Sequence, residues 1–161
     1  MLAVVDVHYA TDHARAACVG FAQWTDATAV HTSTRKSDGA PADYAPGSFY
    51  LRELPHLLAI LEPLRETLEL VIVDGFAMLD ATRPGLGGHL SSSMGLPVIG
   101  VAKTRFVSAP AVPIVRGNAR PLYVTAVGID ANEAARHITE MHGPYRLPTL
   151  LKLADSLARG R

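Results

Sequence analysis

The sequence predicts an α/β fold built on a mixed sheet, with an antiparallel three-strand meander followed by parallel β/α units and with helices on both faces. Three observations support this prediction. Strand-like segments fill the first part of the chain. Apolar runs typical of buried strands then alternate with segments of helical periodicity. Finally, 48% of the 161 residues are hydrophobic, which suffices for one sizeable core, so we expect a single domain over 1–161.

The meander comes first. LAVVDVHY (2–9) reads as a strand, and the segments 15–24 and 27–35 alternate in polarity or are β-branched. The two residues at 25–26 are short enough for a hairpin between them. The Gly-, Pro- and Asp-rich segment 36–47 then predicts a loop.

The β/α units follow. Residues 48–65 predict a helix, because leucines recur there at helical spacing. LELVIVD (68–74) predicts a buried strand, 85–94 a helix that begins after a proline, and LPVIGVA (96–102) another buried strand.

The C-terminal part is less regular. Residues 103–119 predict irregular structure, and RPLYVTAV (120–127) predicts the last strand. Asp130 is expected to cap a helix that runs to about His142, and 147–159 predict the final helix.

Composition limits the function without choosing it. Fifteen basic and fifteen acidic residues cancel, so a nucleic-acid ligand would need a local basic patch. The single cysteine, Cys18, cannot form an intrachain disulfide, and a reducing cytoplasm is the expected location. The first apolar stretch is interrupted at Asp6, too early for a signal peptide or a membrane span.

Three acids are candidates for a metal site. Asp6 follows the apolar run LAVV, Asp74 ends the run LELVIVD, and Glu53 lies on the predicted helix 48–65. If the strand 68–74 runs parallel beside the first strand, Asp6 and Asp74 share one region of the sheet, near the carboxyl ends of the strands where ligands of open α/β sheets bind. Two strand acids and one helix acid can surround a divalent cation, an arrangement suited to phosphodiester chemistry.

Glu53 supplies separate support. It shares a helical stripe with Leu57, Ile60 and Leu64, and a carboxylate on a core-directed stripe needs a partner. A metal ion would be such a partner. The alternatives are an ion pair with a neighbouring arginine, or a place at the wet edge of the stripe.

Several blocks resemble the endonuclease V family, in the family's order. DYAPGSFYLRELP (43–55) resembles its Pro-Tyr-x-Pro-Gly and Phe-Arg-Glu motifs, and VDGFAMLDATRPGLGGHL (73–90) resembles its Val-Asp-Gly-His-Gly block. LPVIGVAKTR (96–105) is similar to its Pro-Thr-Ile-Gly-Val-Ala-Lys strand. RPLYVTAVGI (120–129) and GPYRLPTLLKLAD (143–155) resemble its C-terminal motifs.

The resemblance implies an RNase H-like fold and a Mg²⁺-dependent endonuclease, with Mn²⁺ as a substitute. Its expected partner is DNA or RNA that contains deoxyinosine or inosine, cut at the second phosphodiester on the 3′ side of the deaminated adenine. The metal carboxylates of the family match Asp6, Glu53 and Asp74. Neither a membrane nor a particular oligomeric state is implied.

The resemblance also assigns roles to residues that contact substrate. Tyr44 matches a wedge tyrosine, Lys103 a phosphate-contacting lysine that we count with the catalytic residues, and Arg52 the arginine before the catalytic glutamate. Gly47 and Gly75 would let backbone approach a flipped base. Each has a plainer alternative: a surface tyrosine, a solvated lysine, or ordinary turn geometry.

The chain also departs from the family. Phe76 and Asp80 stand where the Asp-Gly-His-Gly-Ile-x-His block has its histidines, and Asp43 replaces a proline. The later Gly-His of the family has no histidine here, the segment after Lys103 is short, and the helix before the first strand is missing or lies upstream.

Asp80 has two interpretations: an accessory acid that supports a metal, or a negative charge that weakens phosphate binding. The first hypothesis is therefore a metal-dependent nuclease, and the second a catalytically weakened or inactive nucleic-acid-binding module on the same fold. A P-loop nucleotide site is not indicated, because RPGLGG (83–88) lacks the Walker lysine.

Overall fold

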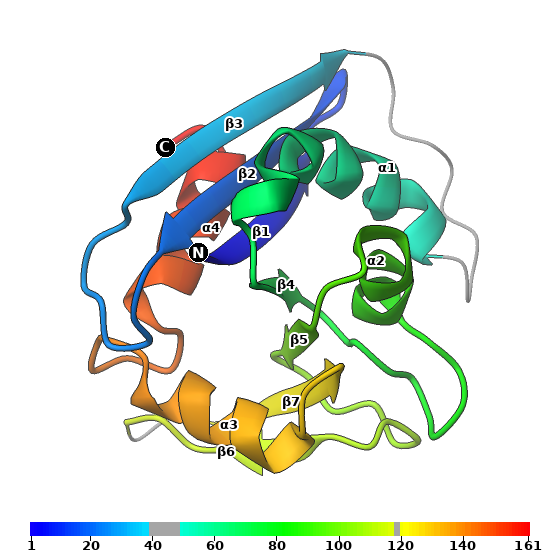
Figure 1. The fold of residues 1–161 in the computed structure, drawn as a ribbon, viewed down its shortest axis with the longest axis vertical. Coiled ribbons are helices and arrows are strands. Elements are labelled where there is room, and N and C mark those ends of the chain that lie inside the picture. The colour runs from blue at the N-terminus through cyan, green and yellow to red at the C-terminus, as the bar shows by residue number, and fades with distance from the viewer. Residues whose placement is uncertain (39–48, 118–119) are drawn as a thin grey trace.

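A computed structural model describes residues 1–38, 49–117 and 120–161. It contains one seven-stranded sheet with strand order β3-β2-β1-β4-β5-β7-β6 (Figure 1). Strands β1, β4 and β5 run parallel to one another at the centre, and antiparallel pairs flank them on both sides. The predicted mixed α/β sheet is thus confirmed.

The meander consists of β1 (Leu2–Tyr9), β2 (His13–Phe21) and β3 (His31–Asp38), paired antiparallel in sequence order. The predicted two-residue hairpin at 25–26 is wrong, because residues 22–30 connect β2 to β3. The Asp26 carboxylate accepts hydrogen bonds from the backbone N–H groups of Ala22 and Gln23, which closes a turn inside this longer loop.

The central units match their predictions closely. Helix α1 (Phe49–Leu61) continues into the 3₁₀ helix η1 (Glu62–Thr67), so the predicted helix 48–65 tightens in its last turns. Then follow β4 (Leu70–Asp74), α2 (Leu86–Met94) and β5 (Val98–Ala102).

The C-terminal part contains β6 (Val112–Ile114), β7 (Leu122–Val127), α3 (Ala131–Glu140) and α4 (Thr149–Ala158). Strand β6 lies in the segment predicted to be irregular, and it pairs with β7 at the edge of the sheet. Strand β7 runs antiparallel to β5, which fits a connection whose described residues form no crossover helix. The Asp130 side chain caps α3 as predicted, by accepting hydrogen bonds from two backbone N–H groups.

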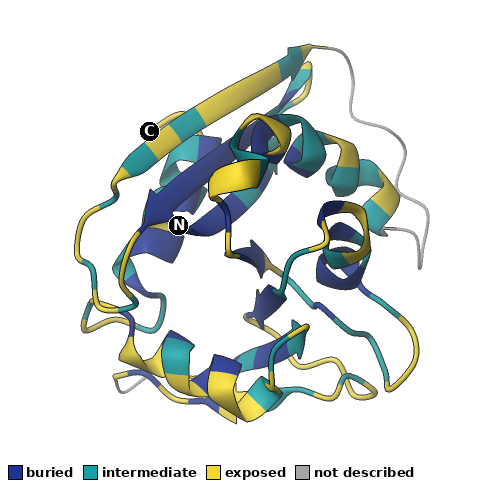
Figure 2. Cartoon of the chain, in the orientation of Figure 1, coloured by how far each residue is buried: buried dark blue, intermediate teal, exposed yellow. Residues whose placement is uncertain are grey.

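Helices cover both faces of the sheet. One core lies under α3 and α4, and the other lies under α1 and α2. Figure 2 shows the central strands buried between them, whereas β3 is largely exposed. Among the described residues, no helix has the length and apolar character needed to cross a membrane.

Strand register brings two of the predicted acids together. Val5 of β1 pairs with Val73 of β4, and Asp6 and Asp74 follow these residues directly. Side chains alternate along a strand, so both acids continue the row that faces α4 rather than the row that faces α1. The expectation that Asp6 and Asp74 share one end of the sheet is therefore correct.

Candidate active site

A cavity of about 280 Å³ opens at the carboxyl ends of β1 and β4. Asp6, Glu53 and Asp74 all line it, so the fold gathers the three acids that were predicted from separate segments. The other lining residues are Val7, His8, Gly75, Asp155 and Arg159. We call this site the acid cavity. Two of its acids have few hydrogen-bond donors: the Asp6 carboxylate accepts from the backbone N–H of Val7, and no described residue donates to Glu53.

Tyr9 fixes Glu53 relative to the sheet. The hydroxyl group of Tyr9, at the end of β1, donates a 3.0 Å hydrogen bond to the backbone carbonyl of Arg52. The Arg52 guanidinium lies over the Tyr9 ring, 3.9 Å from its centroid. Pro55 lies inside α1 and has no backbone N–H to donate to the Leu51 carbonyl, so the contacts at the neighbouring Arg52 secure the helix beside this break in its ladder. Arg52, predicted to bind substrate, thus packs on Tyr9.

The electrostatics of the cavity disfavour two of the negative charges. Burial, with further contributions from Asp6 and Asp74, raises the pKa of Glu53 to about 8. Burial and the nearby charge of Asp74 raise the pKa of Asp6 to about 6. Two carboxyl groups that resist ionisation in a shared cavity are typical of a site that completes its charge balance with a cation.

A fourth acid, Asp155 on α4, was missed by the sequence analysis. It lines the acid cavity, and its charge contributes to the raised pKa of Asp6. The Nε atom of Arg159 pairs with the Asp155 carboxylate at 3.0 Å, one helical turn away. The sequence signal that identifies Glu53 is present here too, because Asp155 shares a helical stripe with Leu147, Leu151 and Ala158.

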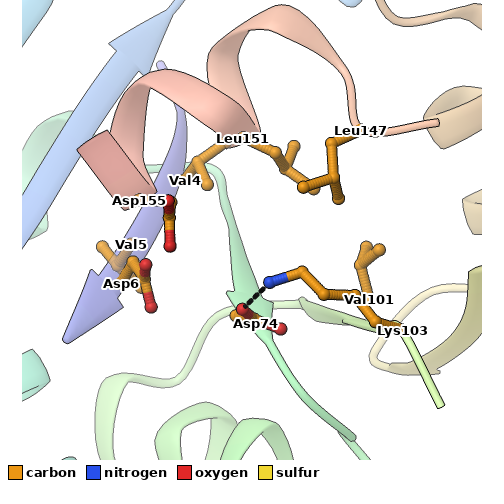
Figure 3. Close-up of a pocket in the computed structure, with 9 residues that line it drawn as sticks. All are labelled: Val4, Val5, Asp6, Asp74, Val101, Lys103, Leu147, Leu151 and Asp155. Atoms are coloured by element: carbon orange, nitrogen blue, oxygen red, sulfur yellow. Dashed lines mark hydrogen bonds and ion pairs between the residues drawn. The ribbon is translucent and has the colours of Figure 1, made fainter. Parts of the chain in front are cut away.

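Lys103 pairs with one of the acids. Its Nζ atom donates a 2.7 Å hydrogen bond to Asp74 (Figure 3). Val101 faces α4, so Lys103, two residues further along the chain, continues the row that contains Asp6 and Asp74. Arg146 donates to the backbone carbonyls of Lys103 and Pro121, which anchors the chain where β5 ends.

The donor set suits a divalent cation, although the side chains do not yet converge on one point. Within the described residues, no three carboxylate or imidazole groups lie close enough to ligate one ion as they stand. Carboxylate oxygens are nevertheless the ligands that Mg²⁺ prefers. Two of these carboxylates have raised pKa values and form no ion pair with a described lysine or arginine. The residues therefore fit a metal ion that would replace protons on Asp6 and Glu53 and compete with Lys103 for Asp74.

Of the other predicted site residues, some lie in the acid cavity and others do not. Gly75 lines the acid cavity with a positive φ of 120°, a conformation that favours glycine. Asp80 does not line this cavity. Its carboxylate caps a turn by accepting from the backbone of Thr82 and Arg83, which lowers its pKa, so it has the geometry of a turn residue rather than of an accessory acid. Tyr44 and Gly47 lie outside the described residues.

A second cavity adjoins the acids. It has a volume of about 350 Å³ and shares Asp74 and Gly75 with the acid cavity. Its walls are mostly apolar or aromatic, and they are formed by Tyr50, Phe76, Leu79, Arg83, Gly85, Leu86 and Phe106. We call it the apolar cavity.

The loop that forms the apolar cavity is held tightly against the sheet. The buried Thr125 hydroxyl accepts a 2.8 Å hydrogen bond from the N–H of Ala77. Gly100 of β5 lies beneath the same loop, where a Cβ atom would collide with the backbone of Gly75 and Ala77. Both contacts fix the chain that follows Asp74, so the apolar cavity and the acids hold a defined relative position.

Comparison with known proteins agrees with this geometry. Residues 1–119 match the sequence profile that describes Endonuclease V. The chain belongs to the endonuclease V family. It is 34% identical over 140 residues to the endonuclease V of Streptomyces avermitilis, with 72% of this chain and 60% of that protein aligned. It is also 32% identical to the endonuclease V of Roseiflexus castenholzii, with 98% of this chain and 80% of that protein aligned.

The fold comparison extends over nearly the whole chain. The structure of Ciona intestinalis endonuclease V in complex with a DNA that contains an inosine superposes with a TM-score of 0.84. It covers 99% of this chain and 84% of that one at 19% identity, which supports the RNase H-like fold. The chain spans about 60% of the length of the first curated endonuclease V relatives that it matches.

Proposed function

We propose that this chain is a metal-dependent endonuclease that hydrolyses a phosphodiester bond on the 3′ side of a deaminated adenine in DNA or RNA. The observation that carries the proposal is the acid cavity, in which Asp6, Glu53, Asp74 and Asp155 come together from four elements. Membership of the endonuclease V family supports the reaction class.

Asp6, Glu53 and Asp74 would hold the cation, Mg²⁺ or in its place Mn²⁺, with Asp155 as an additional ligand. When bound, such a cation polarises the phosphodiester and lowers the pKa of a coordinated water. The protein itself holds the carboxylates near the carboxyl ends of β1 and β4, and among the described residues no lysine or arginine forms an ion pair with Asp6 or Glu53. Lys103 pairs with Asp74 in the absence of substrate, and its ammonium group is placed to move to a phosphate oxygen that enters beside it.

The apolar cavity would receive the flipped base. Its volume of about 350 Å³ lies in the range of small-molecule sites, and its aromatic walls suit a planar base. Because the apolar cavity shares Asp74 and Gly75 with the acid cavity, a base bound there places its own strand across the acids. The complex of Ciona intestinalis endonuclease V with an inosine-containing DNA supports this class of substrate.

The decisive test is cleavage of inosine-containing single-stranded DNA and RNA by the purified protein with Mg²⁺ or Mn²⁺. Asp74→Asn is expected to lower the cleavage rate by about a thousandfold or more, because it removes a charged ligand from the metal site. Glu69→Gln is the matched control, since Glu69 is an exposed acid just before β4, at the opposite end of that strand from Asp74. Folded protein that cuts neither strand with either metal would refute the proposal.

A second candidate function is a nucleic-acid-binding module without catalysis. The observations that favour it are the Lys103 ion pair on Asp74 and the presence of Phe76 and Asp80 in place of the family's histidines. This alternative predicts binding without cleavage, and an affinity that Asp74→Asn leaves unchanged.

A further inference from the structure

A groove with no role in the proposed reaction lies beside the apolar cavity, near the edge of the sheet formed by β6 and β7. It has a volume of about 300 Å³ and is lined by Arg105, Phe106, Ala109, Ala111, Pro113 and Tyr123. All of these residues except Tyr123 belong to the segment 103–119, for which the sequence predicts irregular structure. We call this site the edge groove.

The chain segment that supplies the lining of the edge groove carries charge of one sign only. Residues 81–129 contain no aspartate or glutamate, although the chain as a whole is neutral. Arg105 and Arg120 are exposed in this region, whereas Arg116 is buried and donates to backbone carbonyls of the segment before α4. A polyanion is therefore attracted to this edge by Arg105 and Arg120.

The edge groove is continuous with the apolar cavity. Phe106 lines both sites, and its ring centroid lies 5.9 Å from that of Phe76 in the wall of the apolar cavity. Phe106 is 41% exposed, so its ring remains accessible between the two sites. Asp74 in turn joins the apolar cavity to the acid cavity, so shared residues order the three sites as acids, apolar cavity, edge groove.

An aromatic wall with one guanidinium is a typical receptor for a nucleotide in a single strand. Tyr123 and Phe106 offer ring faces for a base, and Arg105 offers a cation for a phosphate. None of the described residues that line the groove is an acid that would repel the nucleic-acid backbone. Ala109, Ala111 and Pro113 have side chains without hydrogen-bonding groups, so these side chains would not select one base over another.

We propose that the edge groove binds the nucleotide on the 5′ side of the deaminated base, with its base against Tyr123 and Phe106 and its phosphate on Arg105. This assignment rests on the proposed function. The strand direction follows from the order of the three sites: if the phosphodiester on the 3′ side reaches the acids, the opposite direction of the strand leads past Phe106 into the edge groove.

The test uses single-turnover cleavage of an inosine-containing single strand, measured over a series of protein concentrations. Tyr123→Leu is expected to raise the protein concentration for half-maximal rate about tenfold, with the maximal rate retained, because it removes a stacking surface from binding alone. Tyr123→Phe keeps the ring and is expected to behave like the parent protein. Arg105→Gln is expected to lower the salt dependence of binding by about 0.7 in logarithmic slope, the contribution of one phosphate contact on a single strand.

Substrates with one abasic nucleotide distinguish the loss of a stacking contact in the edge groove from a general loss of protein stability. An abasic nucleotide directly 5′ to the inosine should weaken binding by the parent protein about tenfold and should add nothing to Tyr123→Leu. An abasic nucleotide on the 3′ side should add its full effect to that of Tyr123→Leu. If Tyr123→Leu does not fold, the abasic substrates with the parent protein and Arg105→Gln still decide the question, because Arg105 is exposed.

Arg35→Gln is the matched control for Arg105→Gln, since Arg35 is an exposed arginine on β3, at the opposite edge of the sheet. Parent protein that cuts inosine strands while the Arg105 and Tyr123 variants behave like it would overturn the edge groove and leave the proposed function intact. Coupling of Tyr123→Leu to the 3′ rather than the 5′ abasic site would overturn the strand direction. Parent protein that cuts no inosine strand would overturn both proposals.

Discussion

At the scale of single residues, the acid cavity separates its four carboxylates into two classes. Asp74 and Asp155 each have a cationic partner within 3.0 Å, Lys103 and Arg159 respectively. Asp6 and Glu53 have no such partner in the part of the chain that the structure describes, and their pKa values are raised to about 6 and about 8. The two unpaired carboxylates favour the binding of a cation. Lys103 and Arg159, which pair with the other two, can move from their carboxylate to a substrate phosphate when a cation replaces them.

Arg159 should therefore limit cation binding in the absence of substrate. Arg159→Gln frees Asp155, so the Mg²⁺ concentration for half-maximal cleavage should fall about threefold, the usual range for one solvent-accessible ion pair. Asp155→Asn should raise the same concentration, because it removes a carboxylate from the cavity. The measurement is a Mg²⁺ titration of the initial cleavage rate.

Arg136→Gln is the control for this pair. Arg136 makes an equivalent ion pair with Glu140 one turn along α3, outside the acid cavity, and its loss should leave the Mg²⁺ titration unchanged. An equal shift in both arginine variants would show that Arg159 has no specific effect on the site.

At the scale of elements, local patterns predicted the central strands and helices, whereas the edges depended on tertiary contacts. The runs at 2–9 and 68–74 are long and apolar, and they form β1 and β4. Strand β6 has three residues with a proline in the middle, so its sequence carries almost no strand signal, and its pairing with β7 alone defines it. The predicted hairpin is wrong because Asp26 caps a turn inside a connection longer than two residues.

The sequence likewise identified part of the candidate site. Asp6 and Asp74 follow from strand ends, and Glu53 from a charged position on an apolar helical stripe. Asp155 obeys the same rule on α4, but its relevance emerges only when the topology places α4 beside β1. Asp80 is near Asp74 in sequence, yet its own backbone hydrogen bonds satisfy it in a turn.

The contact between β1 and α1 yields a prediction about an element rather than about a ligand. Tyr9→Phe removes the hydrogen bond to the Arg52 carbonyl beside Pro55, which should lower the free energy of unfolding by about 1 kcal/mol. Because the same contact positions Glu53, the variant should also need several times more Mg²⁺ for half-maximal cleavage. Chemical denaturation and a Mg²⁺ titration measure the two effects.

Tyr145→Phe provides the comparison for Tyr9→Phe. Tyr145 is 68% exposed and lies in the segment before α4, so loss of its hydroxyl should change neither stability nor the Mg²⁺ requirement. A Tyr9→Phe protein that is destabilised but keeps the parent Mg²⁺ requirement would contradict the prediction that this β1–α1 contact positions Glu53.

At the scale of the whole molecule, the acids of a neutral chain are unevenly distributed along the sequence. All of the acids lie outside residues 81–129, and the acid cavity combines β1, β4, α1 and α4 from both ends of the chain. The acid-free stretch supplies part of the apolar cavity wall, β5, Lys103 and the edge groove. A polyanion can thus approach along the acid-free edge while its cleavable phosphate reaches the acids, provided that a cation offsets their charge.

This distribution of charge predicts how stability depends on pH. An unfolded chain releases the Asp6 and Glu53 protons near pH 4, whereas the folded chain retains them until about pH 6 and about pH 8. The folded state therefore binds more protons in that interval, so the stability that these two groups contribute is present in acid and is lost as the pH rises from about 4 to about 8. A divalent cation competes with the same protons, so the stabilisation by Mg²⁺ should grow over this interval.

Thermal unfolding in EDTA and in Mg²⁺, at about pH 5 and about pH 8.5, tests this expectation on the intact protein. The melting temperature in EDTA should fall between the two pH values more steeply for the parent than for Glu53→Gln, whose neutral amide has no proton to release. The Mg²⁺-induced rise should be largest at the higher pH for the parent and should shrink in Glu53→Gln at both. The two proteins differ only in this one side chain, so the difference between their pH slopes reports the contribution of Glu53. Identical pH slopes for parent and Glu53→Gln would mean that Glu53 ionises as an ordinary surface carboxylate, and the acid cavity would then lack the charge imbalance from which its metal affinity is inferred.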